Sequence, residues 1–382
     1  MQKALQLVNF WKKKLSAASL LFICILGLLL QGQTPPPYTS YLPIVMNNLG
    51  EKTYSVSIYV QNHAASYMYD LGCAQGKTVA QMAGKQDHLV ILAFGKMWLN
   101  NQTWEYGIRS FSDPTNAYAR RFITFPELLE SGKNFINGYW ACSGSDRDST
   151  LVLGLGTNNY GQLVLNSTFS QDELAAYYRN FGIHWARMVV ALNDWIRQNG
   201  MGSQVMAAGA IDIEWDSITT GERWNTPYVT RAWTDGFDSA DNDQAIYFNF
   251  GACVGCPNYS SVTWKYSTAM PWTQSDIYYV SWQAKPAYVV PEIYLTSGRN
   301  ALQWFGISQF GVWHRGIRVD FSGPMTNLGA CDQRDPNRTG ECKYIDLAPL
   351  DAYDQLLAAL NAYPTTALES MKYITDIRWQ FR

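Results

Sequence analysis

The stretch VMAAGAIDIE, residues 205–214, is typical of a buried strand that ends in carboxylates. Its first six residues are apolar or small, as in a strand of a parallel sheet that is covered on both faces. Side chains alternate along a strand, so Asp212 and Glu214, with Asp216 beyond them, project to one side of it. An apolar strand that ends in acidic side chains indicates a sheet whose chemistry lies at the carboxyl ends of its strands.

On both sides of this strand, short apolar runs alternate with amphipathic stretches of helix length, which favours parallel β/α architecture. We predict strands at residues 54–60, 89–95, 150–156, 205–214, 244–250, 277–282, 289–295 and 304–313. Eight strands with intervening helices predict the α/β fold class and a (β/α)8 barrel of the TIM type. A doubly wound open sheet is the alternative, but no strand is followed by a GxGxxG or P-loop pattern.

Two helices have the clearest boundaries. Ser170 and Glu173 form a capping box at the start of a helix over residues 171–199, and Gly200 ends it. A second helix is predicted over residues 349–363, where it would close the ring after the last strand.

The N-terminal residues 1–33 have the pattern of a signal peptide or an N-terminal anchor. Four lysines precede an uncharged run of 16 residues, 15–30, which is shorter than the ~20 residues that a membrane-spanning helix needs. Cleavage is therefore favoured over anchoring. Cys24 lies inside the run and follows Ile23, which argues against a lipoprotein site. We expect a secreted or extracytoplasmic protein that meets a membrane only through this segment, if the segment stays uncleaved.

Residues 34–50 form a proline-rich spacer, and residues 51–382 a single barrel domain with roughly 330 residues. Within the spacer, residues 41–48 (YLPIVMNN) resemble the start of mature exported bacterial proteins. Without residues 1–33 the chain keeps 25 basic and 31 acidic residues, a net charge of −6. Such a chain has no basic field for nucleic acid, so we expect no nucleic-acid partner.

Six cysteines follow the N-terminal segment, and an even number in an exported chain indicates disulfides. Fifteen pairings are possible. Short loops favour Cys253 with Cys256 and Cys331 with Cys342, which leaves Cys73 with Cys142. Half of a zinc site or a redox motif is the alternative for Cys253 and Cys256, but neither a second CxxC nor a nearby histidine completes a zinc site. We therefore expect no metal and no cofactor.

The candidate catalytic groups are Asp212, Glu214, Asp216 and Glu292. Carboxylates on one face repel one another when ionised, which raises at least one pKa and suits that group to proton donation. The alternative is that these acids cap the next helix or bind surface lysines. Further polar and aromatic residues at predicted strand ends are candidates for substrate binding, because aromatic rings stack on the apolar faces of sugars. These are Lys96, Trp98, Asn158, Asn249, Trp282, Tyr294, Gln309 and Trp313.

A strand that ends in Asp212-x-Glu214 resembles the fourth strand of chitinase-type and lysozyme-type glycoside hydrolases with barrel folds. The resemblance implies that Glu214 is the proton donor and that Asp212 supports it. A tryptophan that ends the last strand, as Trp313 would here, is similar to a sugar platform of the chitinase-like group. The chain departs from the chitinase pattern at Ala210, where that pattern has a further aspartate. Glu292 on the seventh predicted strand offers the strand-four and strand-seven pair of many retaining barrel glycosidases.

Two functions follow from these patterns. The first is an exported glycoside hydrolase that acts on a cell-wall or environmental polysaccharide, with Glu214 as general acid. The second is a non-catalytic glycan-binding or cell-envelope barrel protein, because barrels host many functions. Serine hydrolase and zinc protease activities lack their GxSxG and HExxH motifs, and the acidic loop 238–243 lacks the spacing of an EF-hand calcium site.

Overall fold

The computed structural model describes residues 52–100, 102–111, 121–144, 146, 148–160, 169–215, 224–268 and 270–380. The predicted signal or anchor segment, the spacer and Asp216 lie outside these residues. The chain divides into two units, Met1–Pro43 and Ile44–Arg382, and all described residues belong to the second. Among them, no helix combines the length and the apolar character that crossing a membrane requires.

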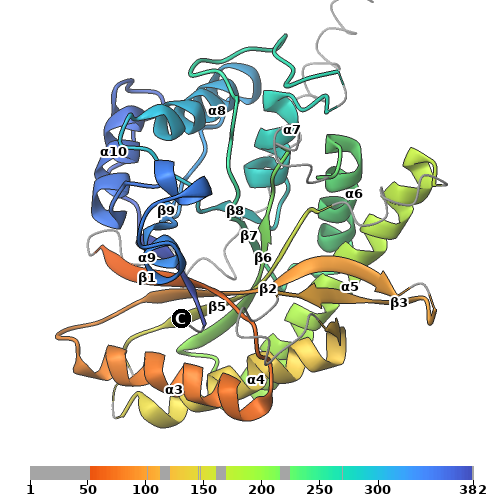
Figure 1. Cartoon of the computed structure of the whole chain (residues 1–382), viewed down its shortest axis with the longest axis vertical. Coiled ribbons are helices and arrows are strands. Elements are labelled where there is room, and N and C mark those ends of the chain that lie inside the picture. The colour runs from red at the N-terminus through yellow and green to blue at the C-terminus, as the bar shows by residue number, and fades with distance from the viewer. Residues whose placement is uncertain are drawn as a thin grey trace, which may run out of the picture. The chain divides into compact units, whose positions relative to one another are not determined.

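Eight parallel strands form the centre of the domain (Figure 1). Leaving aside two additional antiparallel strands, neighbours in the sheet are also consecutive along the chain, except that the first strand pairs with the last. The parallel strands are β1 (Thr53–Tyr59), β2 (His88–Asn100), β5 (Leu151–Asn158), β6 (Val205–Asp212), β7 (Tyr247–Asn249), β8 (Ala287–Val289), β9 (Met325–Thr326) and β10 (Tyr373–Trp379). The first strand pairs with the last, since β1 and β10 are in register along all of their length, from Thr53 with Tyr373 to Tyr59 with Trp379.

The ring closes between β8 and β9. Two parallel bridges join these segments, one between Val289 and Phe321 and the other between Glu292 and Met325. The Ile293 N–H donates to the Met325 carbonyl at 2.9 Å. The predicted fold class, a (β/α)8 barrel with disulfide-bonded loops, is therefore confirmed.

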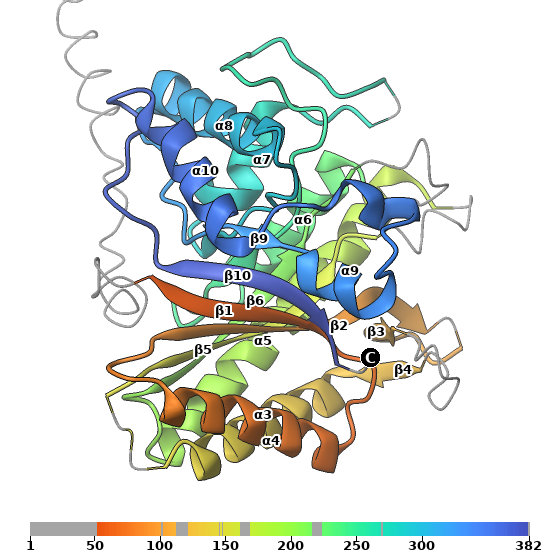
Figure 2. The same ribbon diagram turned by 60° about the vertical axis from the view of Figure 1, so that its left-hand side comes forward.

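Helices connect the parallel strands on the outside of the ring. They are α3 (Ala65–Gln81), α4 (Phe125–Cys142), α5 (Gln171–Gln198), α6 (Pro227–Asp238), α7 (Gln274–Tyr278), the π-helix η2 (Tyr279–Gln283), α8 (Arg299–Arg315), α9 (Leu328–Arg334), the 3-10 helix η3 (Gly340–Tyr344) and α10 (Pro349–Asn361). Figure 2 shows β10, β1, β2 and β5 as neighbouring ribbons, with α3 and α4 on one side and α8 and α10 on the other. The additional strands β3 (Glu105–Ser110) and β4 (Phe122–Thr124) extend β2 as an antiparallel ribbon.

Both predicted helices are confirmed, and the capping box of Ser170 and Glu173 is present at the start of α5. The C-terminal helix α10 precedes the last strand, however, and does not follow it. Five of the eight predicted strands contain a ring strand or most of one, and the segment 289–295 overlaps β8 only at Val289 before continuing into the bridge at Glu292.

Two predicted strands are wrong. Residues 277–282 lie in α7 and η2, where Thr273 and Asp276 form a capping box that starts a helix. Residues 304–313 lie in α8, which is buried on all sides from Trp304 to Gly311 and therefore lacks the polar face that marks a helix in a sequence. The true seventh and eighth strands are β9 and β10.

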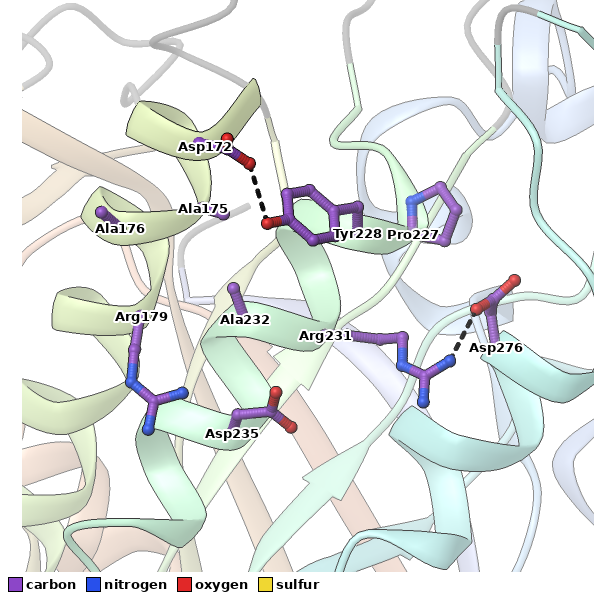
Figure 3. A pocket seen from close by; sticks show the side chains of 10 residues that line it. All are labelled: Asp172, Ala175, Ala176, Arg179, Pro227, Tyr228, Arg231, Ala232, Asp235 and Asp276. Atoms are coloured by element: carbon purple, nitrogen blue, oxygen red, sulfur yellow. Dashed lines mark hydrogen bonds and ion pairs between the residues drawn. The ribbon is translucent and has the colours of Figure 1, made fainter. Parts of the chain in front are cut away.

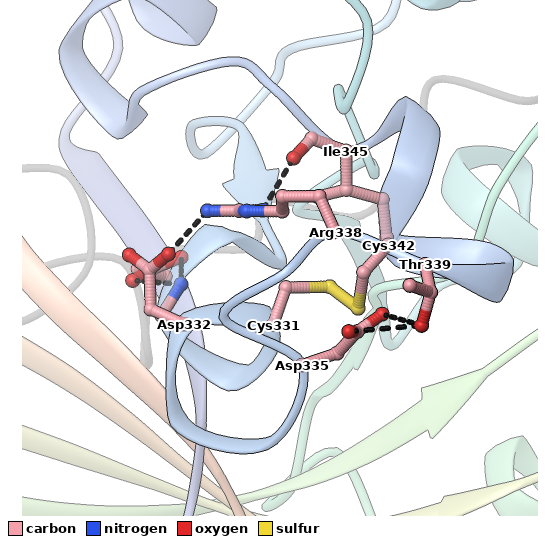
Figure 4. The surroundings of a disulfide bond; sticks show 9 residues. Cys331, Asp332, Asp335, Arg338, Thr339, Cys342 and Ile345 are labelled. Atoms are coloured by element: carbon pink, nitrogen blue, oxygen red, sulfur yellow. Dashed lines mark hydrogen bonds and ion pairs between the residues drawn. A yellow bond between two sulfur atoms is a disulfide. The ribbon is translucent and has the colours of Figure 1, made fainter.

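All three predicted disulfides are confirmed: Cys73–Cys142, Cys253–Cys256 and Cys331–Cys342. The first joins α3 to α4, and the second lies in the loop after β7. The third holds the loop that follows α9, where Arg338 pairs with Asp332 and donates to the carbonyl of Ile345 at 2.7 Å (Figure 4). Because Cys253 and Cys256 are bonded to each other, their thiolates are not available to zinc.

Candidate active site

The carboxyl end of β6 positions two of the predicted catalytic side chains. Ala208, Ala210 and Asp212 share one face of the strand, and Ala208 and Ala210 are fully buried. A side chain on Gly209 would meet Phe237 of α6 at 2.8 Å, so Gly209 faces the outer helices and the opposite face, with Ala210, points into the ring. Asp212 and Glu214 continue the same face and are partly exposed, at the end where the interior opens.

Neighbouring strands bring other predicted residues level with Asp212. Asn158 of β5 is the register partner of Asp212, and Lys96 of β2 is the register partner of Asn158. The ammonium group of Lys96 lies 3.4 Å from the centre of the Tyr160 ring. Lys96, Asn158 and Asp212 therefore form one row across the mouth of the barrel.

Glu292 completes a cluster of three carboxylates. Carboxylate oxygens of Asp212, Glu214 and Glu292 all lie within 4.8 Å of one another. Glu292 follows the sixth strand of the ring, β8, and not the seventh as predicted, and its bridge to Met325 fixes it at the junction with β9. Glu292 is only 7% exposed. The structure thus brings together three of the four predicted catalytic residues, and the fourth, Asp216, lies outside the described residues.

Burial raises the pKa of Glu292 well above its ordinary value, and the charges of Glu214 and Asp212 raise it further. A hydrogen bond between Glu292 and Glu214 favours the protonated form of Glu292. The Tyr294 hydroxyl donates to Glu292 and opposes this rise in the pKa, but it does not reverse it. The cluster therefore holds a proton on Glu292 when ordinary carboxyl groups are ionised.

The same three side chains are the set that could hold a hard divalent cation, because such ions take carboxylate oxygens as ligands. A bound cation would displace the proton from Glu292, because a metal ligand must be deprotonated. The cluster therefore fits either a shared proton or such a cation, and the absence of a metal stays a prediction.

Aromatic side chains that the sequence interpretation missed lie at the same end of the barrel as these carboxylates. Tyr59 and Trp379 end β1 and β10, and their ring centres lie 4.6 Å apart. Phe111 packs against both rings, and the Arg334 guanidinium lies 3.7 Å from the centre of the Trp379 ring. The charge of Tyr59 is one cause of the raised pKa of Tyr294, so Tyr59 lies within electrostatic range of the residue that donates to Glu292. Trp379 was missed because its strand was missed.

Trp379 also corrects the expectation for Trp313. A tryptophan does end the last strand of the ring, but it is Trp379. Trp313 lies near the end of α8 and is 58% exposed, and Gln309 of the same helix accepts a hydrogen bond from the Ser260 N–H at 2.9 Å. These two residues are helical, not at a strand end.

The remaining predicted binding residues lie apart from the carboxylates. Trp98 lies on the part of β2 that pairs with β3, with Arg109 4.8 Å from its ring centre. Asn249 is buried, donates to the Ser281 hydroxyl at 2.8 Å and accepts from the Gly251 N–H at 3.1 Å. Trp282 lies in η2, which leads into β8, so it belongs to the opposite end of the strands.

A cavity of about 580 Å³ lies on the outer wall, between α5, α6 and the start of α7 (Figure 3). Tyr228 donates to Asp172 at 2.9 Å across its rim, and Arg231 pairs with Asp276 at 3.0 Å. None of the predicted site residues lines it, and two of its charged groups, Arg231 and Asp276, pair with each other. The barrel mouth remains the candidate active site.

No family model matches the chain, and no curated protein matches it. Among solved structures, the chain is similar to a GH18 chitinase from Pseudoalteromonas aurantia, with a TM-score of 0.41, 11% identity, and coverage of 86% of this chain and 95% of that one. It is also similar to a GH113 β-1,4-mannanase, with a TM-score of 0.41, 10% identity, and coverage of 86% of this chain and 88% of that one.

Proposed function

We propose that the domain is a glycoside hydrolase whose proton donor is Glu214. The observation that carries this proposal is the cluster of Asp212, Glu214 and Glu292 at the mouth of the barrel, with the pKa of its most buried member raised. Glycosidases use a pair of carboxyl groups, one protonated and one ionised, on either side of the bond that they cleave. A cluster that keeps one proton among three carboxyl groups meets this requirement.

Exposure assigns the roles. Glu214 is partly exposed at the mouth, whereas Glu292 lies behind it and is 7% exposed. A sugar oxygen would reach Glu214 first, and the proton that Glu214 shares with Glu292 is the one that it donates. Asp212, at the end of β6, is then the ionised partner that faces the sugar ring.

The short separation favours a retaining mechanism. One oxygen from each carboxyl group lies within 4.8 Å of the others, which is nearer to the ~5–5.5 Å between the carboxyl groups of retaining enzymes than to the ~6.5–9.5 Å of inverting enzymes. In the first step Glu214 protonates the glycosidic oxygen, the bond to the anomeric carbon breaks, and the Asp212 carboxylate bonds to that carbon. In the second step water, deprotonated by Glu214, displaces Asp212.

The competing function is a non-catalytic glycan-binding barrel whose carboxylates are held in ion pairs. Within the described part of the chain, no lysine or arginine forms an ion pair with Glu292. The raised pKa of Glu292 is what a buried carboxyl group without a paired cation produces, and it favours the enzyme.

We further propose that the substrate is a cell-wall or environmental polysaccharide and that the domain works in an oxidising compartment outside the cytoplasm. The three disulfides support the compartment. The partly exposed Trp379 ring at the same end of the barrel as the carboxylates supports a sugar ligand.

The test is a screen of residues 51–382 against peptidoglycan, chitin, and plant and fungal polysaccharides for released reducing ends, with Glu214→Gln as the matched inactive variant. We expect release by the natural sequence and at least about 100-fold less by the variant. Binding of a polysaccharide without release would support the glycan-binding function and overturn the enzyme.

A further inference from the structure

The backbone that carries Glu214 is held by one buried side chain, Asn159. The Asn159 side-chain nitrogen donates to the Glu214 carbonyl at 2.9 Å, and its side-chain oxygen accepts from the Glu214 N–H at 2.9 Å. The ladder between β5 and β6 ends at the pair of Asn158 and Asp212. Asn159 follows directly and is 1% exposed, so its amide supplies the two hydrogen bonds that another strand would have supplied.

Asn159 is itself fixed from three directions. Its backbone N–H donates to the Asp212 carbonyl at 3.1 Å, and its carbonyl accepts from the Asn225 N–H at 3.1 Å. Its side-chain nitrogen also donates to the Thr230 hydroxyl of α6 at 3.2 Å. The amide can therefore neither rotate nor shift without breaking other buried bonds, which makes it a rigid support.

A second anchor acts on the next residue. The Trp215 indole N–H donates to the Val254 carbonyl at 2.9 Å, and Trp215 is 2% exposed. Val254 lies inside the loop closed by Cys253 and Cys256. Glu214 thus projects from a backbone held on both sides, although it lies beyond the end of β6.

We propose that Asn159 is a positioning residue, which fixes the Glu214 carboxyl group against Glu292 by clamping the backbone of Glu214. This inference rests on the proposed function for the catalytic role of Glu214, and on the hydrogen bonds alone for the clamp. Displacement of a catalytic group by about 1 Å can lower the rate by about 100-fold, so the clamp has a kinetic consequence.

The chain provides a matched control on the same strand. Asn193 of α5 is 5% exposed; its side-chain nitrogen donates to the Ala207 carbonyl at 2.9 Å and its oxygen accepts from the Ala207 N–H at 2.8 Å. Ala207 lies in β6, five positions before Asp212. Asn193→Ala therefore removes the same pair of buried bonds from the same strand, at a place that does not support the carboxylates.

The first experiment compares kcat and its pH profile in Asn159→Ala and Asn193→Ala. Both variants should lower the melting temperature, but only Asn159→Ala should lower kcat, by about 10- to 100-fold, and move the acidic limb of the profile. If the alanine variant does not fold, Asn159→Asp provides a second variant. It keeps the acceptor for the Glu214 N–H but loses the donor to the Glu214 carbonyl, so kcat should again fall. Equal kcat losses in the Asn159 and Asn193 variants would overturn the positioning role.

The second experiment needs no substrate. Carbon-13 NMR titration of glutamate carboxyl groups follows the Glu292 signal, assigned by its absence in Glu292→Gln. If the clamp holds Glu214 near Glu292, Asn159→Ala should lower the Glu292 midpoint toward its ordinary value, and Asn193→Ala should leave it unchanged. An unchanged midpoint in Asn159→Ala overturns the clamp. A lowered midpoint in a domain that cleaves no glycan upholds the clamp and overturns the proposed function instead.

Discussion

Glu214 and Glu292 share a hydrogen bond but differ in exposure, and this difference predicts different results when each is changed to glutamine. Glu214→Gln keeps the shape and removes the proton that the leaving oxygen needs. We expect kcat to fall by about 100-fold or more, with glycan affinity and melting temperature retained, because general acid catalysis contributes that much. Asp212→Asn should cost at least as much under the retaining mechanism proposed above. Undiminished turnover in Glu214→Gln would remove that residue from the mechanism.

Glu292→Gln should instead change the dependence of stability on pH. The folded-state pKa of Glu292 lies well above the ordinary value of 4.5, so the folded state binds a proton that the unfolded state releases above that pH. This contribution to stability is fully present below about pH 4.5 and is lost as the pH rises through the folded-state pKa. Glutamine cannot lose a proton, so the variant should match the natural sequence in acid and be the more stable of the two at pH 8.

Thermal unfolding of both proteins between pH 4 and pH 8 tests this, with Glu130→Gln as an exposed control outside the cluster. A parallel pH dependence in the two proteins would show that Glu292 ionises with an ordinary pKa.

At the residue level, the sequence was sufficient to identify the acidic residues of the fourth strand, because an apolar run followed by Asp212 and Glu214 is a pattern of consecutive residues. It could not place Glu292 on the correct strand, since that required the positions of the later strands. Tyr59 and Trp379 had no such pattern. They meet only because β1 and β10 pair across almost the whole length of the described chain.

At the level of elements, periodicity predicted the long amphipathic helix α5 and failed for α8. Twelve residues of α5 are buried in a regular stripe, whereas the middle of α8 is buried on every side and shows no stripe. The strand β9 has only two residues, too few for any alternation to be recognised. The periodicity of the sequence therefore identified the class of fold but not the last two strands of the ring, β9 and β10.

The disulfides stabilise elements to different degrees, because the entropy lost by the unfolded chain grows with the loop that each bond closes. Cys73 and Cys142 are 69 positions apart, and Cys253 and Cys256 only 3. Replacing both cysteines of a pair by serine should lower the free energy of unfolding by about 4 kcal/mol for the first and about 2 kcal/mol for the second. Chemical denaturation measures this. Six free thiols in the native protein would contradict this prediction, because they would show that the three disulfides do not form.

At the scale of the whole molecule, one end of the barrel carries the candidate active site and the other carries interactions that stabilise the fold. The carboxylates and the aromatic rings lie at the carboxyl ends of the strands. At the amino ends, Asp87 precedes β2 and is 6% exposed. It accepts from the Thr150 N–H at 3.1 Å and hydroxyl at 2.6 Å beside β5, and lies 3.6 Å from the Lys372 ammonium group beside β10.

Asp87 therefore links residues beside three strands of the ring, β5, β2 and β10. Its removal should destabilise the barrel without changing the active site. In Asp87→Ala the Lys372 side chain, 9% exposed, would remain buried without its carboxylate, and two donors of Thr150 would lose their acceptor. Breaking one side of a buried ion pair costs about 3–5 kcal/mol, so the free energy of unfolding should fall by about that much. Most of this loss comes from the Lys372 charge that is left buried without a partner, so adding Lys372→Met should restore part of the stability. In both variants, kcat of the folded fraction at 25 °C should stay within about twofold of the natural sequence. Urea unfolding and initial rates on the same samples separate the two effects: a fall in kcat without a fall in stability would mean that the amino ends of the strands contribute to the chemistry after all.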